Sequence, residues 1–252
     1  MIINVITPVG DIKNLDKTIV SIERIAELND NFHFKHILVF NNNVINKLKN
    51  KKKYNYELLA LDINPISSRS EARNYGIENI NFNKKSLVIF LDVGDILLSN
   101  PFSLIYKNFN NNFTNSIFRN KTICQIEGKK TYVPNYPLFL KSIVNPFMLS
   151  SIFISSDLLI NMKFVNEKKE DWIFWYKILL NKPKIFNINK PSYIYKVDNL
   201  KKHYKNKYNS FLKLYQILYT YFKWGKPIIY IIILFHLILI SSRWLLIRIK
   251  SV

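Results

Sequence analysis

The sequence predicts an α/β fold with a mostly parallel sheet and flanking helices, followed by a basic and apolar helical tail. Short apolar runs alternate with amphipathic stretches four times in about 95 residues, which is typical of parallel strands joined by helices. The chain has 252 residues, 48% of them hydrophobic, which is enough to bury such a core. From about residue 200, lysines and long apolar runs replace the alternation.

The first two elements are expected over residues 1–8 and 15–26. Residues 1–8 form an apolar run that stops at Thr7-Pro8, as a strand buried on both faces does. No basic residues precede the run, so it does not match a signal peptide. Apolar residues recur every three or four positions through 15–26, which predicts an amphipathic helix.

Further apolar runs predict strands over 36–40, 56–61 and 86–91, and a helix is expected over 68–77. Between about 116 and 165, prolines interrupt short apolar runs, so less regular strands and loops are expected there. In a sheet of this kind, ligands bind at the carboxyl ends of the strands.

Polar residues follow three of the predicted strands at that edge. They are Thr7 with Pro8, the asparagines at 41–43, and Asp92 with Asp95. Two carboxylates at a strand end suit Mg²⁺ or Mn²⁺ bound together with phosphate oxygens. Aspartates in such places also cap helices and form turns, which is the alternative interpretation.

A second acidic pair, Glu170-Asp171, opens a predicted helix over 170–180. Acidic side chains in a first turn complement the helix dipole, and capping is one explanation for them. The other explanation is that one carboxylate points into the ligand site and acts as a general base.

Composition excludes several classes of protein. Cys124 is the single cysteine, so a disulfide framework and a multi-cysteine metal site are excluded, and a reducing compartment fits. The five glycines lie too far apart for a dinucleotide-binding or P-loop motif. The net charge of +20 indicates an anionic partner, although an A+T-rich genome also explains the lysine excess. Only six of the 37 basic residues are arginine, which argues against sequence-specific DNA binding.

The order of these motifs resembles the family 2 glycosyltransferases, inverting nucleotide-sugar enzymes of GT-A fold. The likeness covers residues 1–200, which are accordingly expected to form the glycosyltransferase domain. It rests on five segments: Val5-Ile6-Thr7-Pro8, Phe40-Asn41-Asn42-Asn43, Ser70 to Ile77, Phe90 to Asp95, and Glu170 to Trp175.

The resemblance implies a donor site and a metal site. Four residues would surround the nucleotide base: Thr7, Pro8, Asn41 and Asn42. Arg73 would lie near the ribose or phosphate, and Asp92 with Asp95 would hold Mg²⁺ or Mn²⁺ on the diphosphate. Lys196 and His203 loosely match a late basic or histidine residue of the family, and His203 is the candidate third metal ligand. A solvated surface histidine is the alternative.

The resemblance also implies that Asp171, with Glu170 beside it, is the base that takes the proton of the acceptor hydroxyl, so that C1 is inverted in a single displacement. The cation and basic residues would stabilise the leaving diphosphate. Gly94 departs from the family, which usually has an acidic residue there, and this leaves open whether the metal site is intact. Asn41 and Asn42 also replace residues that are usually acidic.

Residues 201–252 form the expected tail. Lysines precede an aromatic-rich helix over 211–222, and the 13 residues 228–240 are apolar except for one histidine. About 20 residues are needed to cross a bilayer. We expect helices that lie on the anionic inner face of the cell membrane, on the cytoplasmic side. Packing on the first domain or on a second subunit is the alternative.

The expected function is therefore a membrane-associated inverting glycosyltransferase of the hexosyltransferase class. Its donor would be a nucleoside-diphosphate sugar, UDP-linked, and its acceptor a saccharide, lipid-linked, in the synthesis of bacterial capsule, O-antigen or lipooligosaccharide. No nucleic-acid partner is expected. The alternatives are a non-catalytic membrane scaffold of the same fold, which Gly94 favours, and a basic nucleic-acid-binding protein, which the arginine count disfavours.

Overall fold

The computed structural model describes residues 1–41, 56–63, 68–109, 113–126, 129–133, 138, 145, 147–167 and 169–197. Its strands are β1 (Ile2–Val9), β2 (His33–Asn41), β3 (Glu57–Ile63), β4 (Ser86–Phe90), β5 (Ile96–Leu97), β6 (Ser116–Ile126), β7 (Lys129–Val133), β8 (Ile152–Ser155) and β9 (Lys184–Val197). Its helices are α1 (Leu15–Glu27), α3 (Arg69–Glu78), α4 (Asn100–Phe109) and α5 (Glu170–Leu180), with short 3₁₀ helices η2 (Leu149–Ser151) and η3 (Ser156–Leu159).

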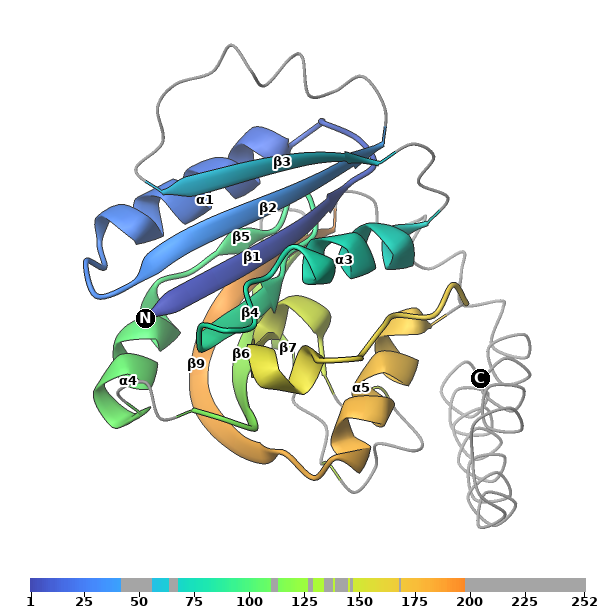
Figure 1. Cartoon of the computed structure of the whole chain (residues 1–252). Helices are drawn as coiled ribbons and strands as arrows, with labels where there is room; N and C mark the ends of the chain where they lie inside the picture. The colour runs from blue at the N-terminus through green and yellow to red at the C-terminus, as the bar shows by residue number, and fades with distance from the viewer. Residues whose placement is uncertain are drawn as a thin grey trace, which may run out of the picture.

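The described strands form one sheet in the order β3-β2-β1-β4-β8-β6-β9-β5, with β7 paired to β6 (Figure 1). The first four strands are parallel to one another. All five residues of β4 are buried, which explains why its sequence is apolar at every position rather than at alternate ones. The predicted α/β fold is confirmed.

The second half of the sheet is mixed. Strand β6 is antiparallel to β7 and β8 and parallel to β9, while β5 is antiparallel to β9. The less regular strands expected over 116–165 are thus β6, β7 and β8. Strand β9 was not predicted, and Figure 1 shows it as a long curved strand. The register between β6 and β9 shifts around Lys121, which pairs with Pro191.

Helices cover both faces of the sheet. On one face, α3, α5 and η3 pack in a core with residues of β1, β2, β4 and β8. On the other face, α1 and α4 pack on residues of the same sheet. In β4 the side chains alternate accordingly, with Val88 and Phe90 in the first core and Leu87 and Ile89 in the second.

A glycine brings α3 close to β1. A methyl group on Gly76 would lie 2.5 Å from Cγ2 of Ile6, whose side chain is fully buried. The absence of a side chain at this position therefore lets α3 approach the sheet and carry its polar residues toward the carboxyl ends of the strands.

The tail predicted over residues 201–252 lies outside the described residues, as do Asn42 and His203. Among the residues that are described, no helix combines the length and the apolar character that a membrane span requires.

Candidate active site

The ends of β1 and β2 lie side by side, but Thr7 turns inward. Thr7 and Pro8 pair in register with Leu38 and Val39 of β2. Thr7 Oγ1 is 2.9 Å from Nε2 of His36, and both side chains are fully buried. Burial lowers the pKa of His36 to about 3, so the ring is neutral.

These positions bear on the predicted base-binding residues. The hydroxyl of Thr7 is committed to His36 in the protein interior. Pro8 is buried in β1, and Asn41 is the last residue of β2. Their part in nucleotide binding stays a prediction.

The acidic segment after β4 is a turn held by α1. The Asp95 amide donates to the Asp92 carbonyl at 3.1 Å. Thr18 of α1 accepts from the Gly94 amide at 2.9 Å and donates to the Asp95 carbonyl at 3.0 Å. Gly94 has φ +93°, a backbone conformation that favours glycine. The backbone of the turn therefore explains why a glycine stands at position 94.

Asp95 points into the protein. Its residue is 6% exposed, and Ser150 Oγ donates to its Oδ2 at 3.1 Å. Burial, and then the charge of Asp92, raises the pKa of Asp95 to about 8. At neutral pH the carboxyl group is mainly protonated, and it is a poor ligand for a cation in that form.

Arg73 joins the two acidic segments. Its side chain is 2% exposed, and its two terminal nitrogens lie 3.0 Å from Asp92 Oδ1 and 3.0 Å from Glu170 Oε1. Arg69 lies 3.7 Å from Asp92 Oδ2. One buried guanidinium thus links the carboxyl end of β4 to the first turn of α5, although 97 residues separate Arg73 from Glu170.

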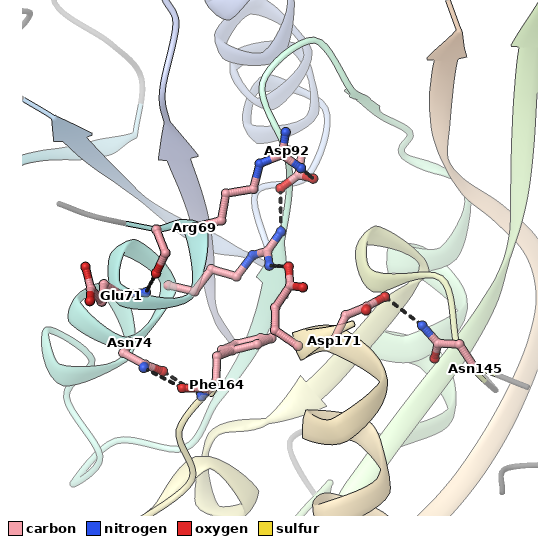
Figure 2. Close-up of polar contacts among 10 residues, drawn as sticks. Arg69, Glu71, Asn74, Asp92, Asn145, Phe164 and Asp171 are labelled. Carbon is pink, nitrogen blue, oxygen red and sulfur yellow. Dashed lines mark hydrogen bonds and ion pairs between the residues drawn. The ribbon is translucent and has the colours of Figure 1, made fainter. Parts of the chain in front are cut away.

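Asn74 and Phe164 fix the approach to α5. The Asn74 side chain donates to the Phe164 carbonyl at 2.9 Å and accepts from the Phe164 amide at 2.7 Å (Figure 2). The guanidinium of Arg73 lies 5.3 Å from the centre of the Phe164 ring, which stacks on Phe174 of α5. Consecutive residues of α3 therefore position both the segment before α5 and its first residue.

Asp171 has a separate partner. Asn145 Nδ2 donates to Asp171 Oδ2 at 2.6 Å, and Figure 2 shows the Asp171 carboxylate turned toward Asn145. Burial and the adjacent charge of Glu170 raise the pKa of Asp171, while hydrogen bonds and Arg73 oppose the rise. A raised pKa makes a carboxylate a stronger base.

The described residues do not fit a divalent cation. Both carboxylate oxygens of Asp92 face guanidinium groups, Asp95 is buried on Ser150, and Gly94 has no ligand atom in its side chain. Within the described part of the chain, no cluster of three or more His, Cys, Asp or Glu side chains has the arrangement to hold a metal ion. Mg²⁺ or Mn²⁺ with Asp92, Asp95 and His203 stays a prediction.

The structure thus brings together three predicted residues, Arg73, Asp92 and Glu170, with Asp171 next in the chain. Two residues of the site, Arg69 and Asn145, were not expected from the sequence. Arg69 precedes Arg73 by four residues, a spacing that puts both on one face of a helix, so a signal was present. Asn145 follows a proline-interrupted segment without periodicity, and no sequence signal identifies it.

Parallel strands with an acidic turn after β4, and an acidic first turn of α5 facing it, define a GT-A-like α/β fold. Solved structures of this fold are similar to the chain. TarS 1–349 from S. aureus in complex with UDP has a TM-score of 0.60 and 16% identity over 87% of this chain and 65% of that one. The same fragment in complex with UDP-GlcNAc has a TM-score of 0.58 and 16% identity over 79% and 59%.

The mannosyltransferase PcManGT from Pyrobaculum calidifontis, in complex with GDP-Man and Mn²⁺, has a TM-score of 0.59 and 10% identity over 89% of this chain and 65% of that one. The chain spans less than two thirds of the length of each of these three structures. No protein-family model and no curated protein sequence matches it. At these identities the likeness establishes the fold.

Proposed function

We propose that this chain is an inverting glycosyltransferase that transfers a sugar from a nucleoside-diphosphate sugar to a saccharide acceptor. The observation that carries the proposal is the buried contact of Arg73 with both Asp92 and Glu170. It supports a site in which the end of β4, where ligands bind in α/β sheets, adjoins the helix with the proposed base, Asp171.

The donor is proposed to be UDP-linked. TarS is solved with UDP and with UDP-GlcNAc, and PcManGT with GDP-Man, so nucleoside-diphosphate sugars bind to proteins of this fold. UDP and GDP sugars are therefore the two donor series to test, and the UDP series is the one we expect to bind.

Asp171 is proposed to remove the proton of the acceptor hydroxyl. As the proton moves to the carboxylate, the acceptor oxygen attacks C1 of the sugar and the bond from C1 to the diphosphate oxygen breaks, so the nucleoside diphosphate leaves with the electron pair. Attack from the face opposite the leaving group inverts C1. The raised pKa of Asp171 and its hydrogen bond from Asn145 support this role.

Membrane association and a lipid-linked acceptor are further parts of the proposal. They rest on the lysine-rich and apolar sequence of residues 201–252 and on the net charge of +20. Binding of the full chain to vesicles with and without anionic lipid tests this part separately from catalysis. Salt-sensitive binding to the anionic vesicles alone is the expected result.

The test of catalysis compares Asp171→Asn with the wild type in the full chain. Release of nucleoside diphosphate from UDP-sugars and GDP-sugars is measured with and without saccharide acceptors, and donor affinity is measured by calorimetry. Asp171→Asn is expected to lower turnover about 100- to 10,000-fold, the usual contribution of a general base, with donor affinity unchanged. Glu78→Gln, a surface carboxylate of α3 paired with Lys163, is the control and is expected to match the wild type.

Two results would contradict the proposal. Wild-type turnover in the Asp171→Asn variant would remove Asp171 from the chemistry. Donor binding without turnover of any sugar would favour the non-catalytic scaffold, which Gly94 and the burial of Asp95 make the second candidate.

A further inference from the structure

The donor diphosphate needs a positive partner in the proposed reaction, because negative charge develops on it as the bond to C1 breaks. A divalent cation held by carboxylates is one solution. Around the acidic turn, position 94 has no side chain, and Asp95 is turned into the core onto Ser150. Asp92 is the only carboxylate of the turn that faces the site, and two guanidinium groups already neutralise it.

Arg73 is not available to a ligand as that positive partner. It is almost completely buried, and its terminal nitrogens are engaged by Asp92 and Glu170. Its remaining buried donor, Nε, has no hydrogen-bond partner among the described residues. Arg73 therefore has a structural role, because it joins Asp92 to Glu170 in the interior of the site.

Arg69 has the opposite properties. Its side chain is 73% exposed, and its contact with Asp92 Oδ2, at 3.7 Å, is longer than a hydrogen bond. It is the first residue of α3, after the capping residue Ser68. An arginine has five N–H donors in a planar fork that matches phosphate oxygens in pairs. Arg69 is thus an exposed cation beside the turn that follows β4, close enough to Asp92 to be oriented by it.

We infer that the guanidinium of Arg69, rather than a divalent cation on the segment from Asp92 to Asp95, binds the diphosphate of the donor. The inference rests on the proposed function and names the group that takes up the charge of the leaving diphosphate. Asp92 positions Arg69 from one side, and Arg73 positions Asp92 from the other. Donor binding is then independent of divalent metal.

The test measures binding of UDP, GDP and uridine to the full chain by calorimetry, after EDTA treatment and again with Mn²⁺ or Mg²⁺ added. Wild-type protein is expected to bind its preferred diphosphate in EDTA with a Kd within about twofold of the value in metal. Arg69→Gln is expected to weaken diphosphate binding about tenfold, about 1.4 kcal/mol, and to leave uridine binding unchanged. Arg69→Lys, which keeps the charge and loses the fork, is expected to lie between the two.

The matched control is Arg24→Gln, because Arg24 is an exposed arginine on α1, which packs on the other face of the sheet. It is expected to bind as the wild type does. Diphosphate binding that is lost in EDTA and restored by Mn²⁺ or Mg²⁺ would overturn the inference and leave the proposed function standing, as would equal binding by Arg69→Gln and wild type. No binding of either diphosphate, with or without metal, would overturn both.

Discussion

Replacing Arg73 tests whether its buried guanidinium is the link between the two acidic segments. The change is Arg73→Met, which keeps a long apolar side chain and removes the charge. Asp92 and Glu170 then lose their shared partner, because each lies 3.0 Å from a different nitrogen of Arg73. Both the stability of the fold and the alignment of β4 with α5 are expected to suffer.

The expected loss follows from the geometry. A hydrogen bond to a charged group contributes about 1.5–3 kcal/mol, and Arg73 makes two of them. The side chains of Asp92 and Glu170 are 34% and 24% exposed and regain water when the arginine is removed, so the lower end applies to each. We expect the free energy of unfolding to fall by about 3 kcal/mol, which lowers Tm by about 6–12 °C for a domain of this size.

Urea unfolding of the full chain measures the loss through the midpoint at constant m-value. Arg73→Lys keeps the positive charge but cannot contact two carboxylates in the same way. Its free energy of unfolding is therefore expected to fall by about half as much as that of Arg73→Met. Arg24→Met, at an exposed arginine, is expected to stay within about 0.5 kcal/mol of wild type.

A double-mutant cycle with Glu170→Gln isolates the pair and is expected to give a coupling energy of about 1 kcal/mol or more. A loss below about 1 kcal/mol in Arg73→Met, or a coupling energy near zero, would refute the reasoning that this guanidinium joins β4 to α5.

Two further predictions concern packing and pH. Gly76→Ala is expected to lower the free energy of unfolding by about 1–2 kcal/mol, because the new methyl group would lie 2.5 Å from the buried side chain of Ile6. Gly10→Ala, with no atom within 4 Å, is the control in the same urea assay, and equal stability of the two variants would contradict the packing argument. Asp95 keeps its proton up to about pH 8 in the folded state, whereas in the unfolded chain it loses it near pH 4. The folded state binds more protons between these values, so this group's contribution to stability falls as pH rises from 4 to 8, by up to about 1.4 kcal/mol per pH unit. In Asp95→Asn the free energy of unfolding is expected to lack this decrease with pH. Parallel profiles of unfolding free energy from pH 5 to 8 for the variant and the wild type would refute the role given to Asp95.

The sequence predicts the first half of the fold well because its signals are local. The apolar runs that become β1, β2 and β4 are buried on both faces of the sheet, so consecutive residues in each run are apolar and the run can be recognised without knowing its neighbours. The start of α3 is also encoded locally, since Ser68 Oγ accepts from the Glu71 amide at 3.2 Å.

Strand β9 was missed because its sequence contradicts its conformation. Pro191 lies within it, and Asn189 has φ +57°, which a regular strand does not adopt. Strand β9 pairs with β6, about 70 residues earlier in the chain, and a shift in the register of this pairing accommodates Asn189 and Pro191. No window of sequence around β9 contains that partner.

The sequence identifies candidate residues for the site but not how their side chains are directed. The spacing of Asp92 and Asp95 is visible in the sequence, but the direction of each side chain is not. Asp95 turns inward because α1 holds its backbone through Thr18 and because Ser150 meets its carboxyl group, and both contacts are remote in sequence. The pairing of Asp171 with Asn145 likewise depends on how two distant segments pack.

The pairing of β5 with β9 joins the segment after the acidic turn to a strand that comes about 90 residues later in the chain. Strand β5 follows that turn directly, and its two residues pair with Tyr193 and Ile194 near the end of the described chain. A nascent or truncated polypeptide that stops before these residues has all of β1 to β5 and still lacks the neighbour that anchors β5. The parallel half and the mixed half of the sheet are consequently not separable modules.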